Sequence, residues 1–394
     1  MIKEDLRAVL NWDSCKECGA CLSECRYLGF SAEEAVAEIK KINRGEHSDV
    51  TERCVSCYAC DAFCPEGAHP YERIHYTWDE RYRRGGLPAR AGYLTPGQRP
   101  NFRQDLRFDE DERRLLERWS SPEPPAKTVL YPGCNLMSLP LLASGALFEK
   151  LPVWGSWEHC CGEMFFRMGL LDRVKKTARD LTAYYDGKDI DEMVFACPAC
   201  YNMFTNVLPK QFGARFNFKT TFFTDWFWKE VDSGAITVRE NLSGSAAVHD
   251  SCHGRVLGAD FMEKQREGLR RLGIETRDTV PDLKQGLCCG MASGARRYSI
   301  TDLARYSSMG LAELDKTEGD FGLIYCTGCL LTFSMVRMTR PFGKKLVHPL
   351  ELYRKAVGEK APRKHMSRAR SMLAGIALNA LPKYFTRKRF RLEE

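Results

Sequence analysis

Five cysteines between residues 252 and 329 lie in three short motifs: His249-Asp250-Ser251-Cys252-His253, Gly286-Leu287-Cys288-Cys289-Gly290 and Ile324-Tyr325-Cys326-Thr327-Gly328-Cys329. The same order of one cysteine, an adjacent pair and a C-x-x-C occurs upstream, at Cys134, Cys160, Cys161, Cys197 and Cys200. Equivalent cysteines are 118 residues apart at the first position, 128 at the pair and 129 at the last. These offsets indicate an internal duplication in which one segment of the first copy is shorter.

Short apolar runs precede the cysteine motifs in both copies, at residues 128–131, 193–196, 246–248 and 321–325. Such runs are typical of strands in an open α/β layer, in which functional groups lie at the carboxyl ends of the strands. Segments with helical periodicity and length lie between the runs, at residues 171–185 and 300–314. The sequence therefore predicts two pseudo-symmetric α/β domains.

The adjacent pairs Cys160-Cys161-Gly162 and Cys288-Cys289-Gly290 cannot serve one site from a regular strand, because neighbouring side chains there point to opposite faces. We expect both pairs on turns, where the following glycine permits the necessary backbone angle. Five thiolates are one more than a cubane cluster or a tetrahedral zinc ion requires. Either one cysteine of each set is spare, or the metal centre is not a simple cube.

Two further cysteine runs lie near the N-terminus, as Cys15-x-x-Cys18-x-x-Cys21-x-x-x-Cys25 and Cys54-x-x-Cys57-x-x-Cys60-x-x-x-Cys64-Pro65. This is the spacing of bacterial ferredoxins, in which three thiolates hold one [4Fe-4S] cluster and the fourth binds the other. It predicts one ligand set of Cys15, Cys18, Cys21 and Cys64, and a second set of Cys25, Cys54, Cys57 and Cys60. A pair of structural zinc sites is the alternative, although zinc does not require the third and fourth cysteines of each run.

The rest of the chain divides at changes in composition. Ser31 with Glu34 three residues later predicts a capped helix over residues 31–41, which favours a helical two-cluster module. Glycine and proline crowd residues 81–127, which we interpret as a solvated, arginine-rich linker with a helix at residues 110–119. The predicted organisation is a two-[4Fe-4S] ferredoxin-like module (1–80), a linker (81–127), a first cysteine-rich domain (128–240), a second (241–359) and a basic amphipathic tail (360–394).

These motifs resemble the cysteine-rich CCG family, which occurs in the B-type and fused D-type subunits of heterodisulfide reductase and in iron-sulfur subunits of glycolate and glycerol-3-phosphate dehydrogenases. The second copy fits the spacing of that family, with 35 and 36 residues in the two gaps between its motifs. The first copy has 25 and 35. We therefore expect the first copy to lack a connecting element while keeping its full set of cysteines.

The resemblance implies that each copy holds a noncubane four-iron cluster through its five cysteines, in addition to two [4Fe-4S] cubanes in the N-terminal module. All eighteen cysteines are then used. The order of the parts is similar to the D-type subunit, which implies reduction of a disulfide or a related acceptor. The reacting groups are expected in the second copy, at Cys252, Cys288, Cys289, Cys326, Cys329 and His253. We expect His253 to hydrogen-bond a cluster sulfur; the alternative is proton donation to a leaving thiolate.

Composition restricts the location and the partners. The 394 residues are 44% hydrophobic and 28% charged, and the start of the chain has no apolar signal segment, so we expect a cytoplasmic protein with reduced thiols. Residues 360–394 hold ten Lys and Arg against two Glu, whereas the other 359 residues hold 49 basic and 50 acidic residues. This distribution argues against a general nucleic-acid binder.

The tail has apolar residues at helical spacing between residues 372 and 385, flanked by basic residues. Such a segment predicts contact with the cytoplasmic face of an anionic membrane, with a partner subunit or with its own domain. The sequence contains no flavin or nicotinamide motif, so we expect another protein to donate the electrons. The alternative function is an electron relay between a flavin dehydrogenase and membrane quinone or a cytochrome b partner.

Overall fold

Two parallel sheets form the body of the protein, and the computed structural model describes residues 2–392. The first sheet has the order β2-β3-β4, with β2 (Thr128–Tyr131), β3 (Glu192–Phe195) and β4 (Lys219–Phe222). The second has the order β6-β5-β7-β8, with β5 (Ser245–His249), β6 (Glu275–Asp278), β7 (Phe321–Ile324) and β8 (Lys345–Val347). Every pair of neighbouring strands in both sheets is parallel.

The two sheets are copies of one another, because β2, β3 and β4 take the places of β5, β7 and β8. Only β6 has no full counterpart; a single bridge between Leu130 and Val153 stands in its place. The second copy reaches β6 through the long helix α15 (Ala259–Arg270), whereas the first has only η4 (Pro140–Ala143) and α9 (Leu147–Lys150). The expectation of a missing connecting element is confirmed, since the shorter segment has no room for a long helix and a strand.

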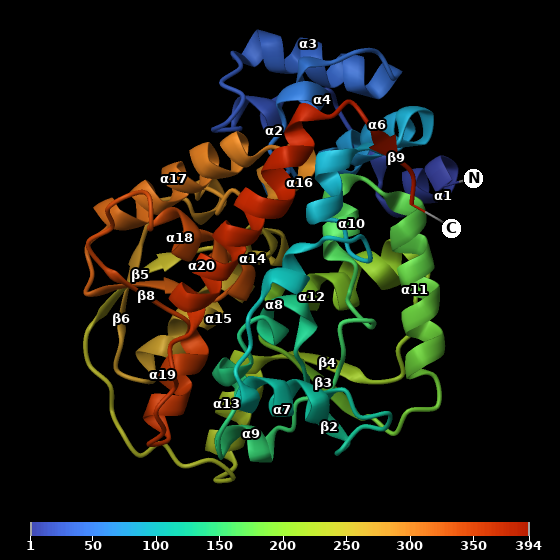
Figure 1. Cartoon of the computed structure of the whole chain (residues 1–394). Coiled ribbons are helices and arrows are strands. Elements are labelled where there is room, and N and C mark those ends of the chain that lie inside the picture. The colour runs from blue at the N-terminus through green and yellow to red at the C-terminus, as the bar shows by residue number, and fades with distance from the viewer. Residues whose placement is uncertain (1, 393–394) are drawn as a thin grey trace.

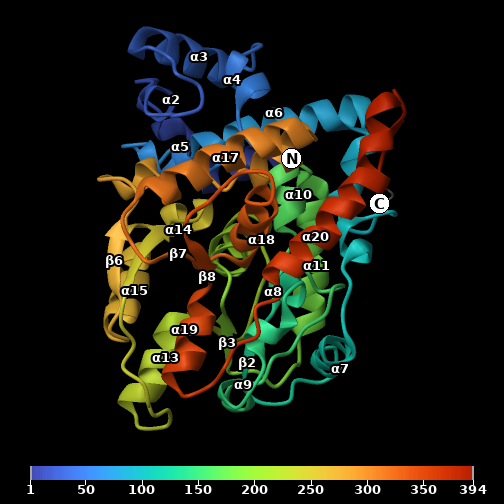
Figure 2. The same ribbon diagram turned by 60° about the vertical axis from the view of Figure 1, so that its left-hand side comes forward.

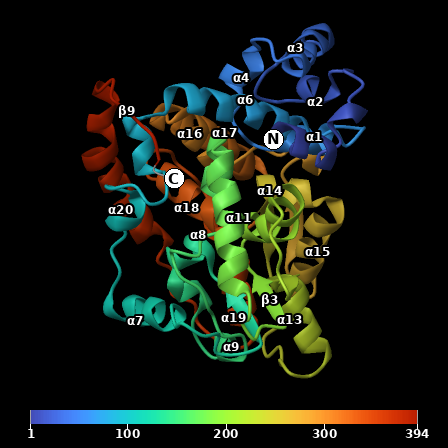
Figure 3. The same ribbon diagram turned by 90° about the vertical axis from the view of Figure 1, so that its right-hand side faces the viewer.

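Helices cover both sheets, and the α/β class is confirmed (Figure 1). In the first unit they are α8 (Gly133–Met137), α10 (Glu163–Met168), α11 (Leu171–Tyr185), α12 (Pro198–Asn202), the π-helical turn η5 (Met203–Gln211) and α13 (Phe223–Asp232). In the second they are α14 (Cys252–Leu257), η6 (Leu283–Gln285), α16 (Met291–Arg297), α17 (Ile300–Lys316), α18 (Thr327–Val336) and α19 (Pro349–Ala356). The helix predicted at residues 171–185 is α11, which runs along the outside of the first unit (Figure 3).

The N-terminal module is helical, as predicted. It contains α1 (Ile2–Val9), η1 (Trp12–Ser14), α2 (Ala20–Ser23), α3 (Ala32–Arg44), α4 (Asp49–Arg53), α5 (Ala59–Phe63) and α6 (Pro70–Gly85). The capping box of Ser31 and Glu34 is present at the start of α3. Helices α2, α3 and α4 form an outer layer, and α5 and α6 lie between this layer and the α/β units (Figure 2). Accordingly, α5 packs against α14, and α6 packs against α10.

Apolar residues of the module belong to hydrophobic clusters of different kinds. Leu22, Ile39 and Ile42 belong to a small cluster within the module itself. Val55 and Tyr58, in the second cysteine run, belong instead to the large core shared by both α/β units. The second run is therefore fixed directly to the body of the protein.

Residues 81–127 and the tail pack against each other and on the body. The first contains the end of α6, then β1 (Leu87–Pro88), η2 (Ala89–Tyr93), η3 (Phe102–Asp105) and α7 (Glu110–Trp119), the last with the predicted bounds. The tail contains α20 (His365–Gly375), η7 (Ile376–Ala380), η8 (Leu381–Phe385) and β9 (Arg389–Phe390). Strand β9 pairs antiparallel with β1, and α20 lies along α18 and η3.

Side-chain contacts hold the tail in place. Arg368 forms an ion pair with Glu112 of α7, and each side chain is only 2% exposed. Of the three alternatives for the tail, packing on its own chain is thus observed. Leu378, Leu381 and Phe385 nevertheless remain 74%, 44% and 92% exposed. Within residues 2–392, no helix combines the length and the apolar character needed to cross a bilayer.

Candidate metal centres

The four cysteines predicted to hold the first cubane lie around one small cavity of about 20 Å³, lined by Cys15, Cys18, Cys21 and Cys64. Burial, followed by the charges of the other three thiols, raises the pKa of Cys21 above its usual value. Gly19, between Cys18 and Cys21, has φ +75°, and a Cβ there would lie 2.7 Å from the backbone nitrogen of Val36. The turn that carries these thiols therefore depends on a glycine.

The second predicted set also comes together, because Cys25 reaches from the first run to the second. Burial, followed by the charge of Cys57, raises the pKa of Cys25 to about 11. Burial, Cys57 and Cys25 likewise raise the pKa of Cys54 to about 12. Burial, with the charges of Cys54 and Cys57, also raises the pKa of Cys60. The structure thus groups the eight thiols in the crossed arrangement that the ferredoxin spacing predicts.

The spacing of the sulfurs bears on the zinc alternative. All eighteen cysteines are free thiols, and within residues 2–392 no three cysteine sulfurs lie within 4.8 Å of one another. Four sulfurs around one tetrahedral zinc ion would be about 3.8 Å apart, given Zn–S bonds of about 2.3 Å. The wider spacing fits iron-sulfur clusters, which contain several metal atoms, better than single zinc ions.

In both α/β units the cysteines follow the carboxyl ends of strands. Cys134 lies in α8 after β2, and Cys252 begins α14 after β5. Cys197 and Cys326 are the N-caps of α12 and α18, after β3 and β7. A helix N-terminus stabilises negative charge. Hydrogen bonds with Cys200 and Cys326 lower the pKa of Cys197 well below its usual value, whereas the hydrogen bond with Cys197 raises the pKa of Cys326.

The adjacent pairs lie on turns, as predicted. Gly162 and Gly290, which follow the pairs, have φ values of +76° and +84°. A Cβ at Gly290 would lie 2.5 Å from the backbone nitrogen of Ser307 in α17. Glycine is therefore needed both for the backbone angle and for the close approach of α17.

The two five-cysteine sets meet inside the molecule. Each thiol shifts the pKa of its neighbours along a row of all ten cysteines, in the order Cys134, Cys160, Cys161, Cys200, Cys197, Cys326, Cys329, Cys289, Cys288 and Cys252. The Sγ atoms of Cys161 and Cys200 are 3.6 Å apart. The junction joins Cys197 to Cys326, which are equivalent positions of the duplication. All five cysteines of each set take part in the row.

Only one end of this row reaches a large cleft. The five cysteines of the second set are all buried, with exposed fractions between 2% and 9%. Cys160 of the first set lines a cleft of about 670 Å³ whose walls carry four cationic side chains, those of Arg99, Arg103, Arg173 and Lys176. The sequence analysis expected the reacting groups in the second set, and that expectation stays a prediction; solvent access is greater at the first.

The cleft adjoins a smaller chamber above the first set. This chamber, of about 70 Å³, is lined by Cys134, Cys160, Cys161 and Cys200 and by apolar side chains that include Phe102, Met164, Leu331 and Met372. Arg103 borders both spaces, and its Nη2 lies 3.5 Å from Cys160 Sγ. Hydrogen bonds with Cys134 and Cys161, together with the charge of Arg103, lower the pKa of Cys160 well below its usual value.

A buried arginine connects the N-terminal module to both units. Arg167 of α10 donates from Nη2 to Cys252 Sγ at 2.9 Å and from Nε to Glu163 Oε1 at 2.5 Å. Its Nη1 donates to the backbone oxygen of Ser56 in the second cysteine run. Burial opposes the charge of Glu163, but Arg167 and His253 outweigh this effect and lower the pKa of Glu163 to about 2.

The predicted site histidine takes part in the same network. Nε2 of His253 lies 3.0 Å from Glu163 Oε1, and Nδ1 lies 3.2 Å from Asn202 Nδ2. Both ring nitrogens are thus engaged by groups of the first unit. These two contacts hold the imidazole ring of His253 beside Cys252, as expected of a residue that positions its neighbours.

Sequence reasoning missed Arg103 and Arg167. The abundance of arginine in residues 81–127 was visible, but we interpreted that segment as solvated, whereas Arg103 stacks against Trp157 with 5.1 Å between guanidinium carbon and ring centroid. Nothing in the local sequence marks Arg167. Arg296 and Arg297, which follow Cys289 closely in the sequence, have structural partners: Arg296 lies 3.6 Å over the ring of Trp78, and Arg297 pairs with Asp302.

Comparison with known proteins matches both copies. The profile of the CCG family, described as a cysteine-rich domain, matches residues 129–205 and again residues 246–334. Each match spans one complete five-cysteine set. No curated protein matches the chain.

Proposed function

We propose that this chain, in which two segments match the cysteine-rich CCG family, is an iron-sulfur redox protein that delivers electrons from its N-terminal module to a disulfide in the cleft at Cys160. Two [4Fe-4S] cubanes in the module and a noncubane cluster in each CCG domain are the cofactors of this proposal. When bound, such clusters accept and donate single electrons and offer an open iron position to a thiolate.

One observation carries the proposal: the four thiol sets follow one another through the molecule. Burial raises the pKa of Cys60, and the charge of Cys21 in the first set adds to the effect. Burial also raises the pKa of Cys57, and Cys252 of the second CCG set adds to it. The junction of Cys197 with Cys326 then leads to the first CCG set and the cleft. The four thiol sets thus lead from the exposed thiol of Cys18 to the opening beside Cys160.

Buried cations along this row stabilise added negative charge. Arg167 donates to Cys252, and Arg255 donates from Nη2 to the backbone oxygen of Cys57 at 3.2 Å. Both guanidinium groups lie where the module meets the second CCG domain. Each electron that arrives there increases the negative charge, and a fixed cation in a low-dielectric setting offsets it.

The cleft favours an anionic disulfide. Its four cationic side chains outnumber its two carboxylates, Glu158 and Asp180, so the excess positive charge attracts carboxylate or phosphate groups. The apolar chamber behind Arg103 excludes water from the thiols of the first set. Reduction of one disulfide consumes two electrons and releases two thiolates. The cation of Arg103 is placed to bind a substrate anion and to stabilise a thiolate next to Cys160.

The test uses protein purified without oxygen and loaded with about sixteen iron atoms per chain. With a chemical electron donor, it should release thiols from a disulfide that bears carboxylates. Arg103→Gln should lower kcat/KM for that substrate by about tenfold or more, the loss expected for one charge-assisted contact, and should affect an uncharged disulfide less. Arg179→Gln, an exposed change on α11, is the control. Absence of thiol product from every disulfide tried, with all iron present, would overturn the proposal.

A second candidate function rests on the exposed side chains of the tail. Leu378, Leu381 and Phe385 face outward beside basic residues, a combination suited to an anionic membrane surface or to a partner subunit. We propose, as this alternative, a relay at the cytoplasmic face of a membrane, between a flavoprotein and quinone or a cytochrome b. Flotation with anionic vesicles tests it: the double change of Leu378 and Phe385 to Ser should abolish binding. Equal flotation of the native and changed proteins would argue against this alternative.

A further inference from the structure

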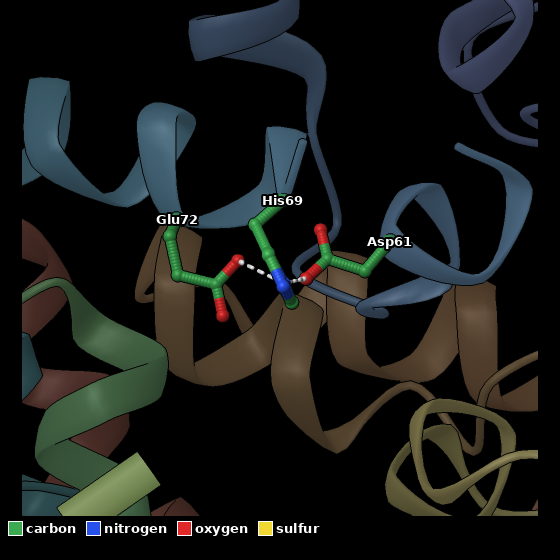
Figure 4. Close-up of side chains that lie close together, drawn as sticks. All are labelled: Asp61, His69 and Glu72. Atoms are coloured by element: carbon green, nitrogen blue, oxygen red, sulfur yellow. Dashed lines mark hydrogen bonds and ion pairs between the residues drawn. The ribbon is translucent and has the colours of Figure 1, made fainter. Parts of the chain in front are cut away.

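Three side chains of types that can bind metals lie close together outside the cysteine sets, where α5 approaches the start of α6 (Figure 4). Nδ1 of His69 lies 2.9 Å from Oδ2 of Asp61 and 3.9 Å from Oε2 of Glu72. One ligand atom from each of the three residues falls within 4.8 Å of the others. Figure 4 shows the imidazole of His69 between the two carboxylates.

The surrounding structure fixes the two carboxylates and leaves one oxygen unused. Oδ1 of Asp61 accepts a hydrogen bond from the backbone N–H of Tyr71 at 2.8 Å. Oε1 of Glu72 accepts from the hydroxyl of Tyr58 at 2.6 Å and from Nε2 of Gln211 at 3.3 Å. Oε2 of Glu72, which points toward His69, is buried without a hydrogen-bond partner. A buried carboxylate oxygen in this situation is costly unless a cation or a donor binds it.

Charge adds a second reason to expect a ligand. The side chains of Asp61 and Glu72 are only 4% and 3% exposed, so two carboxylates lie together away from water. A divalent cation between the carboxylates would offset the repulsion between them and would bind the oxygen of Glu72 that has no hydrogen-bond partner.

We propose that Asp61, His69 and Glu72 bind one divalent transition-metal cation of the manganese, iron(II) or zinc class. Two carboxylate oxygens and one imidazole nitrogen are the donors that such ions accept, and no thiol takes part. The side chain of His69 is 41% exposed, which gives the ion access from solvent. Three protein ligands leave further coordination positions to water.

The site would join two parts of the chain. Its three ligands belong to the N-terminal module, whereas Gln211, which holds Glu72, ends η5 of the first CCG domain. Bound metal would therefore tie α5 and α6 together against that domain. This inference does not depend on the substrate proposed above, because it concerns residues that line neither the cleft nor the thiol row.

The experiment measures manganese uptake by the iron-loaded protein, because occupied cysteine sites do not compete and Mn²⁺ prefers oxygen and nitrogen donors. After equilibrium dialysis against Mn²⁺, elemental analysis should find one manganese ion per chain with the iron content unchanged. Glu72→Gln and His69→Gln should each weaken binding by about tenfold or more, since even supporting contacts to metal ligands carry that much affinity. Glu80→Gln, an exposed change on the same helix, should keep the ion.

Iron content shows whether each variant has folded, so loss of manganese with full iron supports the site. No manganese in the native protein would overturn the proposal. Equal uptake by native protein and Glu72→Gln would also overturn it, because the ion would then lie elsewhere.

Discussion

Replacement of Arg167 by Met is the most demanding test of how the parts fit together. Arg167 is 2% exposed and connects Glu163, Cys252 and Ser56, which belong to three different parts of the chain. Removing one partner of a buried ion pair costs about 3–5 kcal/mol, because the other charge is left without compensation. At an unfolding entropy of about 2.1 cal/mol/K per residue, we expect the Tm of this 394-residue chain to fall by about 4–6 °C.

The assay is thermal unfolding of the iron-loaded protein without oxygen, followed by circular dichroism. Arg84→Met, at a side chain that is 77% exposed, is the control and should shift the Tm little. The double variant with Glu163→Gln removes the uncompensated charge as well, so its loss should be smaller than the sum of the two single losses by about 2 kcal/mol. Additive losses, or a Tm for Arg167→Met equal to that of the control, would refute the role assigned to this arginine.

Three further outcomes are expected. Burial lowers the pKa of His365 from 6.5 to about 4, so the unfolded chain binds the extra proton and stability falls with decreasing pH. Between pH 7.5 and 5.5 this histidine should account for about 1.3 kcal/mol, a loss that His365→Gln removes in chemical unfolding at the two pH values. Gly290→Ala should lower the Tm more than Gly162→Ala, because a Cβ would meet backbone at 2.5 Å in the first case and a threonine side chain at 3.0 Å in the second. Cys289→Ser should lose about four iron atoms and all disulfide reduction while the electron paramagnetic resonance signals of the N-terminal cubanes persist; loss of those signals would contradict independent assembly of the module.

Local sequence patterns predicted the elements that are apolar or clearly capped. The strand at residues 128–131 and the helices at residues 110–119 and 171–185 have the predicted bounds. Strands β4 and β6 were not predicted. Strand β6 reads Glu-Thr-Arg-Asp and is largely exposed at the edge of its sheet, so it lacks the apolar run that marks a buried strand.

The candidate sites also differ in how far they could be predicted from local sequence. Cysteine spacing predicted groups of thiols that the structure does bring together, because each group depends on short segments of regular geometry. The cleft and the chamber beside it could not be predicted from spacing, because Arg103 comes from residues 81–127, Cys160 from the first CCG domain and Met372 of the chamber from the tail. Only tertiary packing places these three residues near one another.

The pairing of β9 with β1 has a consequence for biosynthesis. Strand β1 follows the N-terminal module directly, yet its partner β9 is synthesised only after both CCG domains. The N-terminal module and the two CCG domains, whose cysteines are contributed by short local segments, can therefore fold in turn as they emerge. Residues 81–127 and the tail close over the first set of thiols only once β9 has been synthesised. Until then this set remains open from one side, which leaves a route for the delivery of iron and sulfide.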